Sequence, residues 1–241
     1  MSLLASLIPP GLSFRDPLFL LLLPVVPVAV ALRILRERGL RGEDVDVVLG
    51  ASGGPKWLVL AGLDRFLFGT LLAAPRHRPL HLIGASIGSW RLACFAQRDP
   101  VAALDRSHDA YIEQRYPPRP SIQLITETTA RILDVLLGDG GVDEILGHPT
   151  ARLHVITAEG RGLVASERRA ALTLGLGLAA LANAVSRRTL GAHFRRTLFH
   201  AGGDPGPLAA ISDLPTRHVP LTPVNLRAAL LASASIPLVL S

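Results

Sequence analysis

A serine with the surroundings of a nucleophile stands at position 86. Residues 84–88, Gly-Ala-Ser-Ile-Gly, match the pattern G-x-S-x-G. The apolar run 80–85 predicts a strand before this motif, and the spacing of apolar residues over 87–97 predicts a helix after it. On such a sharp turn the serine hydroxyl projects from the sheet, and glycine leaves room for the neighbouring backbone. We therefore expect a catalytic Ser86 in a nucleophile elbow flanked by Gly84 and Gly88.

A glycine-rich turn at 50–55 is the second motif, also between a predicted strand and a predicted helix. It does not fit phosphate loops, because Trp57 follows Lys56 where the Walker pattern needs Ser or Thr, and G-x-G-x-x-G is absent. The bare N–H groups of Gly53 and Gly54 suit an oxyanion hole instead. Lys56, the only lysine of the chain, would belong to the same oxyanion region. A surface lysine that caps the turn is the alternative.

These two motifs and a third block, Ala-Ser-Ala-Ser-Ile-Pro at 232–237, together resemble the patatin-like phospholipases from about Val45 onward. The third block is similar to the family's A-S-x-x-x-P segment. The resemblance implies a three-layer α/β/α sandwich that hydrolyses acyl esters of lipids with a Ser–Asp dyad, without histidine, metal or other cofactor. It implies Ser86 as the nucleophile and Gly53, Gly54 and Lys56 as the oxyanion region. The sequence departs from the family's G-G-G-x-[KR]-G at Ser52 and Trp57.

The resemblance leaves the proton acceptor for Ser86 unassigned. The resemblance implies an aspartate in a D-G-[GA] segment after the third block, and none follows before Ser241. We therefore expect a chain that is C-terminally truncated relative to the family, and the activity of residues 1–241 themselves stays open. The D-G-G at 139–141 lies upstream between two predicted helices, where we expect a helix-terminating turn.

Two other hypotheses follow from the missing acid. One is a catalytically inactive, truncated fragment that binds lipid. The other is an α/β-hydrolase triad, which needs Ser, an acid and His in chain order; the candidates are Asp204 or Asp213 with His218, and Asp139 with His154. The HGGG signature that would support such a triad is lacking.

Composition limits the partners. The formal net charge is +6, but the arginines are scattered and form no long basic run, so we expect no nucleic-acid partner. We expect a lipid or ester substrate. For the arginines, solvated helix faces are the favoured interpretation, and attraction to an anionic membrane surface is the alternative. No H-E-x-x-H motif predicts a metal site, and we expect no cofactor. Cys94, the only cysteine, excludes a disulfide framework and is expected to be a small buried side chain, as Trp90 is expected to pack in the core.

The coarse element pattern predicts the α/β class, with a mainly parallel sheet. Short apolar runs predict strands at 45–49, 80–85, 152–158, 197–200 and 218–221. Helical spacing predicts helices at 30–38, 56–72, 87–97, 101–114, 123–137, 172–190 and 224–233. Because the helix at 172–190 is nearly uncharged, we expect it to be buried.

The N-terminus differs from the rest. We divide the chain into an apolar extension, 1–28, and a patatin-like acyl hydrolase domain, 29–241. The uncharged stretch 17–32 is short for a membrane-spanning helix and contains three prolines. A mis-assigned start or loose extension, a signal or anchor, and a spanning helix all stay open. We expect a cytoplasmic, membrane-associated protein, with secretion as the alternative.

Overall fold

The computed structural model describes residues 25–236, of which 25–29 by their backbone alone. The chain divides into two compact units, Met1–Asp44 and Val45–Ser241. The described part of the first unit holds helix α3 (Val25–Arg38) and the short helix η1 (Gly42–Asp44), joined by an ion pair between Arg38 and Asp44 of 2.6 Å. The expected boundary at residue 28 falls inside α3. The interpretations of residues 1–24 lie outside the described residues.

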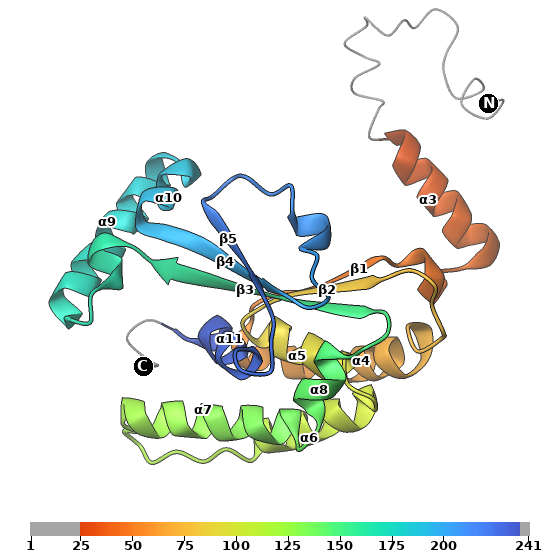
Figure 1. The fold of residues 1–241 in the computed structure, drawn as a ribbon, viewed down its shortest axis with the longest axis horizontal. Helices are drawn as coiled ribbons and strands as arrows, with labels where there is room; N and C mark the ends of the chain where they lie inside the picture. The colour runs from red at the N-terminus through yellow and green to blue at the C-terminus, as the bar shows by residue number, and fades with distance from the viewer. Residues whose placement is uncertain (1–24, 237–241) are drawn as a thin grey trace, which may run out of the picture. The chain divides into compact units, whose positions relative to one another are not determined.

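The second unit is built on a five-stranded sheet in the order β1-β2-β3-β4-β5 (Figure 1). The strands are β1 (Val47–Gly50), β2 (Leu80–Ala85), β3 (Ala151–Gly160), β4 (Phe194–His200) and β5 (Thr216–Pro220). Every neighbouring pair is parallel except β3 and β4, which are antiparallel. The expected α/β class with a mainly parallel sheet is therefore confirmed.

One face of the sheet is covered by helices (Figure 1). They are α4 (Ala61–Phe66), α5 (Ile87–Phe95), α6 (Pro100–Ile112), α7 (Ile122–Leu137), α8 (Gly141–Leu146) and α11 (Leu226–Ala234). The loop after β4, with the short helix η6 (Gly206–Leu208), runs over the opposite face, where Gly206 lies against His81. The arrangement is consistent with the expected α/β/α sandwich.

The core lies between the sheet and its helices. Leu82 and Leu153 of the two central strands are completely buried, as are Leu133 of α7 and Leu230 of α11. The central strands are covered by helices on one face and in part by the loop after β4 on the other, which explains the short continuous apolar runs in the sequence. Burial of these apolar side chains contributes most of the free energy that stabilises the second unit.

Two predicted helices differ from the structure. The helix expected over 56–72 is broken into the 3-10 helix η2 (Gly54–Leu60), α4 and a π-helical turn η3 (Leu67–Leu71). The helix expected to be buried over 172–190 is α9 (Arg169–Val185), and most of its residues are exposed; only Gly175 and Ala179 are buried. The expectation of burial was wrong. An uncharged sequence shows that a helix is apolar, but it does not show whether other elements of the fold cover that helix.

Candidate active site

Ser86 has an unusual backbone. Strand β2 ends at Ala85, helix α5 begins at Ile87, and between them Ser86 has φ 55° and ψ −134°. It is the only non-glycine residue with positive φ in the described part of the chain. Such a conformation costs about 1–3 kcal/mol and persists only where the surroundings enforce it. The turn between β2 and α5 is therefore held in a strained shape that projects the side chain at its tip.

Two glycines of the motif, Gly84 and Gly88, permit this turn. A Cβ on Gly84 would lie 2.6 Å from the backbone N of Ser89. A Cβ on Gly88 would overlap the carbonyl O of Gly50 and lie 2.7 Å from that of Ala51. The obstacles are backbone atoms, which cannot rotate away as side chains do. The geometry at Gly84 and Gly88 thus agrees with the role that the G-x-S-x-G pattern predicts, and it also presses β1 against the first turn of α5.

Ser233 of α11 holds the elbow from the other side. Its Oγ accepts a hydrogen bond of 2.8 Å from the backbone N–H of Ser86 and donates one of 2.7 Å to the carbonyl of Ile156 on β3. Ser89 adds a hydrogen bond of 2.6 Å from its Oγ to the Ser86 carbonyl. Sequence reasoning did not assign Ser233 a role at the elbow, although the A-S-x-x-x-P segment that contains it was the available signal.

Helix α11 is fixed in turn by Trp90. The indole Nε1–H donates a hydrogen bond of 3.0 Å to the carbonyl of Leu230, and the ring is buried. The expectation that Trp90 packs in the core is confirmed. Because this bond ties α5 to α11, it also keeps Ser233 within reach of Ser86.

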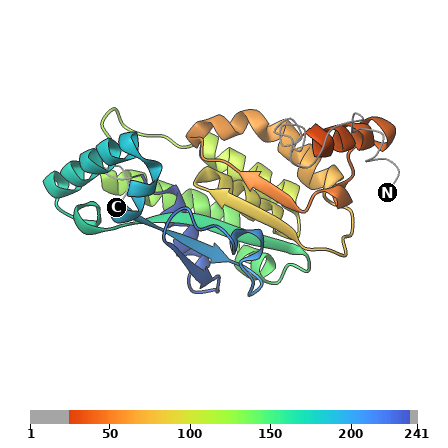
Figure 2. The same ribbon diagram turned by 90° about the horizontal axis from the view of Figure 1, so that it is seen from above.

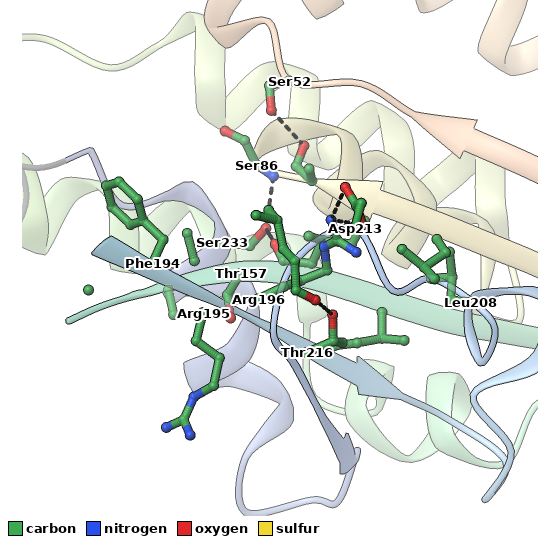
Figure 3. Close-up of a pocket in the computed structure, with 18 of the residues that line it drawn as sticks. Ser52, Ser86, Thr157, Phe194, Arg195, Arg196, Leu208, Asp213, Thr216 and Ser233 are labelled. Carbon is green, nitrogen blue, oxygen red and sulfur yellow. Dashed lines mark hydrogen bonds and ion pairs between the residues drawn. The ribbon is translucent and has the colours of Figure 1, made fainter. Parts of the chain in front are cut away.

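A cavity of about 1130 Å³ opens beside Ser86 (Figure 3). Ser52, Ser86 and Ser233 line it together, so it reaches from the glycine-rich turn to α11. It is larger than the range of about 300–1,000 Å³ that is usual for small-molecule sites. Arg187, Arg195 and Arg196 add three positive charges to the lining, and eight large apolar side chains form its apolar part: Ile156, Val164, Leu172, Phe194, Leu198, Leu208, Ile211 and Leu214. The cavity can therefore accept a long apolar group with one end near the Ser86 hydroxyl.

The glycine-rich turn begins where β1 ends, next to the elbow. The Ser52 hydroxyl donates a hydrogen bond of 3.5 Å to the carbonyl of Ala85, the residue before Ser86 (Figure 3). Gly54 has a left-handed φ of 52°. Within the described residues, the N–H groups of Gly53 and Gly54 have no hydrogen-bond acceptor. These two donors are free for a ligand, as an oxyanion hole requires.

Lys56 and the two glycines are not part of the cavity wall itself. Only Ser52 of this turn lines the cavity, while Gly53, Gly54 and Lys56 follow it in the chain. Lys56 is exposed and forms no ion pair within the part of the chain that the structure describes. The structure therefore brings Ser52 to Ser86 and places the sequence-predicted oxyanion residues one to four positions further along the turn.

The cavity holds few groups that could accept a proton. Among the described lining residues, Asp213 is the only carboxylate, and none is a histidine. Asp213 accepts hydrogen bonds of 2.9 and 3.0 Å from Nη2 of Arg196, and this contact holds the pKa of the carboxyl below its usual range. The Oγ of Ser86 has no hydrogen-bond partner among the described residues. No general base therefore touches the nucleophile within this part of the chain.

His218, the histidine of the first candidate triad, lies away from Ser86, whereas its candidate acid Asp213 lines the same cavity. Across the sheet Ala85 is paired with Ile156, Ile156 with Leu198, and Leu198 with His218. Three strand spacings separate His218 from the row of Ala85, which is about 14 Å. A base must approach to hydrogen-bond distance, so this separation is too large for direct proton transfer.

His154 and Asp139, the second candidate pair for a triad, lie in other parts of the fold. His154 is fully buried, its Nε2 lies 2.9 Å from Nδ1 of His81, and burial lowers its pKa to about 4. Asp139 lies in the turn between α7 and α8, behind Gly138 with φ 57°, as expected for a helix-terminating segment. Cys94 is buried, and burial raises the pKa of its thiol to about 12, which agrees with the expected inert side chain.

Comparison of the chain with protein-family models, with curated proteins and with solved structures finds no match. Within residues 25–236, no three His, Cys, Asp or Glu side chains gather in a way that could hold a metal ion. None of the described helices combines the length and the apolar character needed to cross a membrane.

Proposed function

We propose that this protein is a serine-dependent acyl ester hydrolase of the patatin-like type, acting on lipids or related esters. One observation carries the proposal: Ser86 is held in a strained conformation at a strand-to-helix turn beside a largely apolar cavity, and its hydroxyl has no hydrogen-bond partner among the described residues. Backbone strain of this kind is concentrated at functional sites, where it can be part of the mechanism. The G-x-S-x-G motif and the order of the three sequence blocks support the same assignment.

The proposed reaction has two steps. The Ser86 Oγ attacks the ester carbonyl carbon, its proton passes to a general base, and the carbonyl oxygen becomes an oxyanion. The N–H groups of Gly53 and Gly54 hold that oxyanion; one such donor contributes about 3 kcal/mol to the stability of the transition state. The alkoxide leaving group departs with a proton, and water then hydrolyses the acyl-enzyme. The apolar cavity binds the acyl chain.

The general base is the part of the proposal that the described residues do not supply. The resemblance implies an aspartate that follows Pro237. Residues 214–241 contain no acidic residue. Asp213 itself is a weak acceptor, because Arg196 stabilises its ionised form. We therefore expect residues 1–241 to label at Ser86 more readily than they turn over an ester.

A second candidate is a non-catalytic lipid-binding protein. The absence of any base within hydrogen-bond distance of the Ser86 hydroxyl, among the described residues, favours it. Both candidates share the apolar cavity and differ in whether Ser86 reacts. For either one we propose a cytoplasmic protein that meets its ligand at a membrane surface.

Labelling with a fluorophosphonate probe tests the proposal. The probe should react with Ser86 in the folded chain, located by mass spectrometry, and Ser86→Ala should abolish the label. Ser121→Ala is the matched control: Ser121 caps α7 away from the cavity, so its loss costs about 1 kcal/mol of stability and no labelling. A folded chain that takes up no more probe than the heat-denatured chain would sink the hydrolase and leave the lipid-binding candidate.

A further inference from the structure

Residues 161–193 form an arm at one end of the sheet. Strands β3 and β4 continue beyond the last pair between β2 and β3, Ala85 and Ile156, and end at the pair of Gly160 with Phe194. Between these ends lie the 3-10 helices η4 (Gly162–Ala165) and η5 (Arg187–Thr189), helix α9 and the short helix α10 (Leu190–His193). Figure 2 shows α9 and α10 beyond the sheet rather than over it.

Helix α9 is buried along one narrow stripe only. Its main contacts are with η4, η5 and α10. Gly175 lies so close to the backbone of Leu163 and Val164 that a Cβ would come within 2.9 Å of both. Ala179, one turn later, is buried as well. The small residues of this stripe let α9 pack tightly on η4.

The opposite stripe of α9 is apolar and exposed. It follows helical spacing, contains no charged residue and consists of Ala170, Thr173, Leu174, Gly177, Leu178, Leu181, Ala184 and Val185. Leu181 is 70% exposed and Val185 is 86% exposed. A helix in water normally presents charged residues on this side. A contiguous exposed apolar stripe of this kind indicates a contact surface.

The charges around the stripe indicate what it contacts. Arg168 and Arg169 begin α9, Arg187 and Arg188 follow it, and all four are exposed. None of them forms an ion pair with another described residue. The first two stand at a helix N-terminus, where a positive charge opposes the helix dipole, so they do not serve the stability of α9. Glu167 is the only acidic residue of the arm.

We propose that the arm docks on a bilayer that contains anionic lipids, with the exposed stripe of α9 buried among the acyl chains. The four arginines then contact lipid phosphates at both ends of the helix, which is the pattern of interfacial helices with basic flanks. A protein partner would leave these arginines without matching anions unless it were acidic around an apolar centre, whereas an anionic bilayer has that distribution everywhere. The inference deepens the proposed function by naming the surface that meets the membrane, and it rests on no reaction at Ser86.

The arm also forms one wall of the cavity beside Ser86. Val164 of η4, Leu172 of α9 and Arg187 of η5 all line it. The exposed stripe and Leu172 lie on opposite sides of α9, so docking places this wall of the cavity about one helix diameter, roughly 10 Å, from the lipid surface. If Ser86 is the nucleophile, the docked arm makes the bilayer the nearest source of its esters.

Co-sedimentation of the full chain with vesicles tests the proposal. The parent protein is Ser86→Ala, so that no hydrolysis alters the vesicles. We expect it to bind phosphatidylcholine vesicles that contain about one third phosphatidylglycerol, and to bind pure phosphatidylcholine more weakly. Adding Leu181→Asp and Val185→Asp should lower the partition coefficient at least about tenfold, because both side chains face solvent and their change removes the inserting group. Arg168→Gln with Arg188→Gln should remove the preference for the anionic lipid.

Val224→Asp is the matched control, since Val224 is 91% exposed and lies outside both the arm and the cavity wall. It should bind vesicles like the parent, and circular dichroism and thermal unfolding should be alike for all variants. The proposal is overturned if the parent binds no vesicles, or if binding survives Leu181→Asp with Val185→Asp. It is also overturned if light scattering shows a dimer that this double variant dissociates, because the stripe then contacts a second copy. Fluorophosphonate labelling of the Leu181→Asp, Val185→Asp variant that retains Ser86 tests the proposed function separately, because it measures the reactivity of Ser86 and not membrane binding.

Discussion

The elbow and the arm use the same residue types in opposite ways. Both combine glycine with apolar side chains: Gly88 follows Ile87 at the elbow, and Gly177 lies between Leu176 and Leu178 in α9. At the elbow, Gly88 is pressed against the backbone of β1, and Leu153 on the neighbouring strand is completely buried. In the arm, a Cβ on Gly177 would meet nothing within 4 Å, and Leu181 faces solvent. Apolar composition therefore shows that a segment avoids water, but not whether the chain itself or an external surface provides the contact.

Alanine at Gly88 should have the largest effect. The new Cβ would overlap the carbonyl O of Gly50, and neither backbone can give way without moving β1 or α5. We expect a loss of about 5 kcal/mol, comparable with the entire stability of many domains. Urea unfolding measures it. In the arm, Gly177→Ala should instead stabilise the chain by up to about 1 kcal/mol, since alanine favours a helix. Equal effects at the two sites would remove the contrast between the regions.

Truncation of a leucine separates the regions by packing. Leu153→Ala leaves a void in the core and should lower the free energy of unfolding by about 3–4 kcal/mol. Leu181→Ala in the arm should change it by less than about 0.5 kcal/mol, because an exposed side chain leaves no void. The two chemical denaturation curves measure the difference directly. A Leu181→Ala variant as unstable as Leu153→Ala would mean that α9 is packed within the chain after all.

Acid should weaken the sheet through His154. Burial lowers its pKa to about 4, so between pH 6.5 and 4 the unfolded chain binds a proton that the folded chain resists. The free energy of unfolding is therefore unaffected by His154 above pH 6.5. As the pH falls towards 4, it decreases by up to about 3 kcal/mol. His154→Gln should flatten the slope of unfolding free energy against pH in that window. His77→Gln, at an exposed histidine, is the control, and an unchanged slope in His154→Gln would assign the acid sensitivity elsewhere.

Ser233→Ala should loosen the elbow with a smaller cost in stability. It removes the acceptor for the Ser86 N–H, and we expect a loss of about 1–2 kcal/mol. Fluorophosphonate labelling of Ser86 should slow about tenfold, because the strained turn is no longer fixed from α11. Ser121→Ala is the control, since that hydroxyl caps α7 and does not line the cavity. Equal labelling rates in the two variants would show that Ser233 does not position the nucleophile.

Local chemistry made part of the fold and site predictable. The strand expected over 80–85 has those bounds in the structure, because an apolar run ended by the G-x-S-x-G turn leaves little freedom. The conformation at Ser86 followed from the same motif. The role of Ser233 could not be predicted in this way, since it bonds across 147 residues of sequence.

The errors have two separate causes. The helix α8, which was not predicted, has only six residues and too little periodicity to detect. The burial of α9 was misjudged because its sequence is apolar on both stripes, and only the fold decides which one η4 covers.

The antiparallel step between β3 and β4 has a consequence for how this protein can change. The arm leaves the sheet at Gly160 and returns at Phe194, and these two residues face each other in the ladder. Because the ladder already holds both ends together, a longer, shorter or different insert between them adds little closure entropy. The arm is thus an exchangeable module: another sequence grafted at this junction would keep the turn between β2 and α5 and would replace the cavity wall that Val164, Leu172 and Arg187 form.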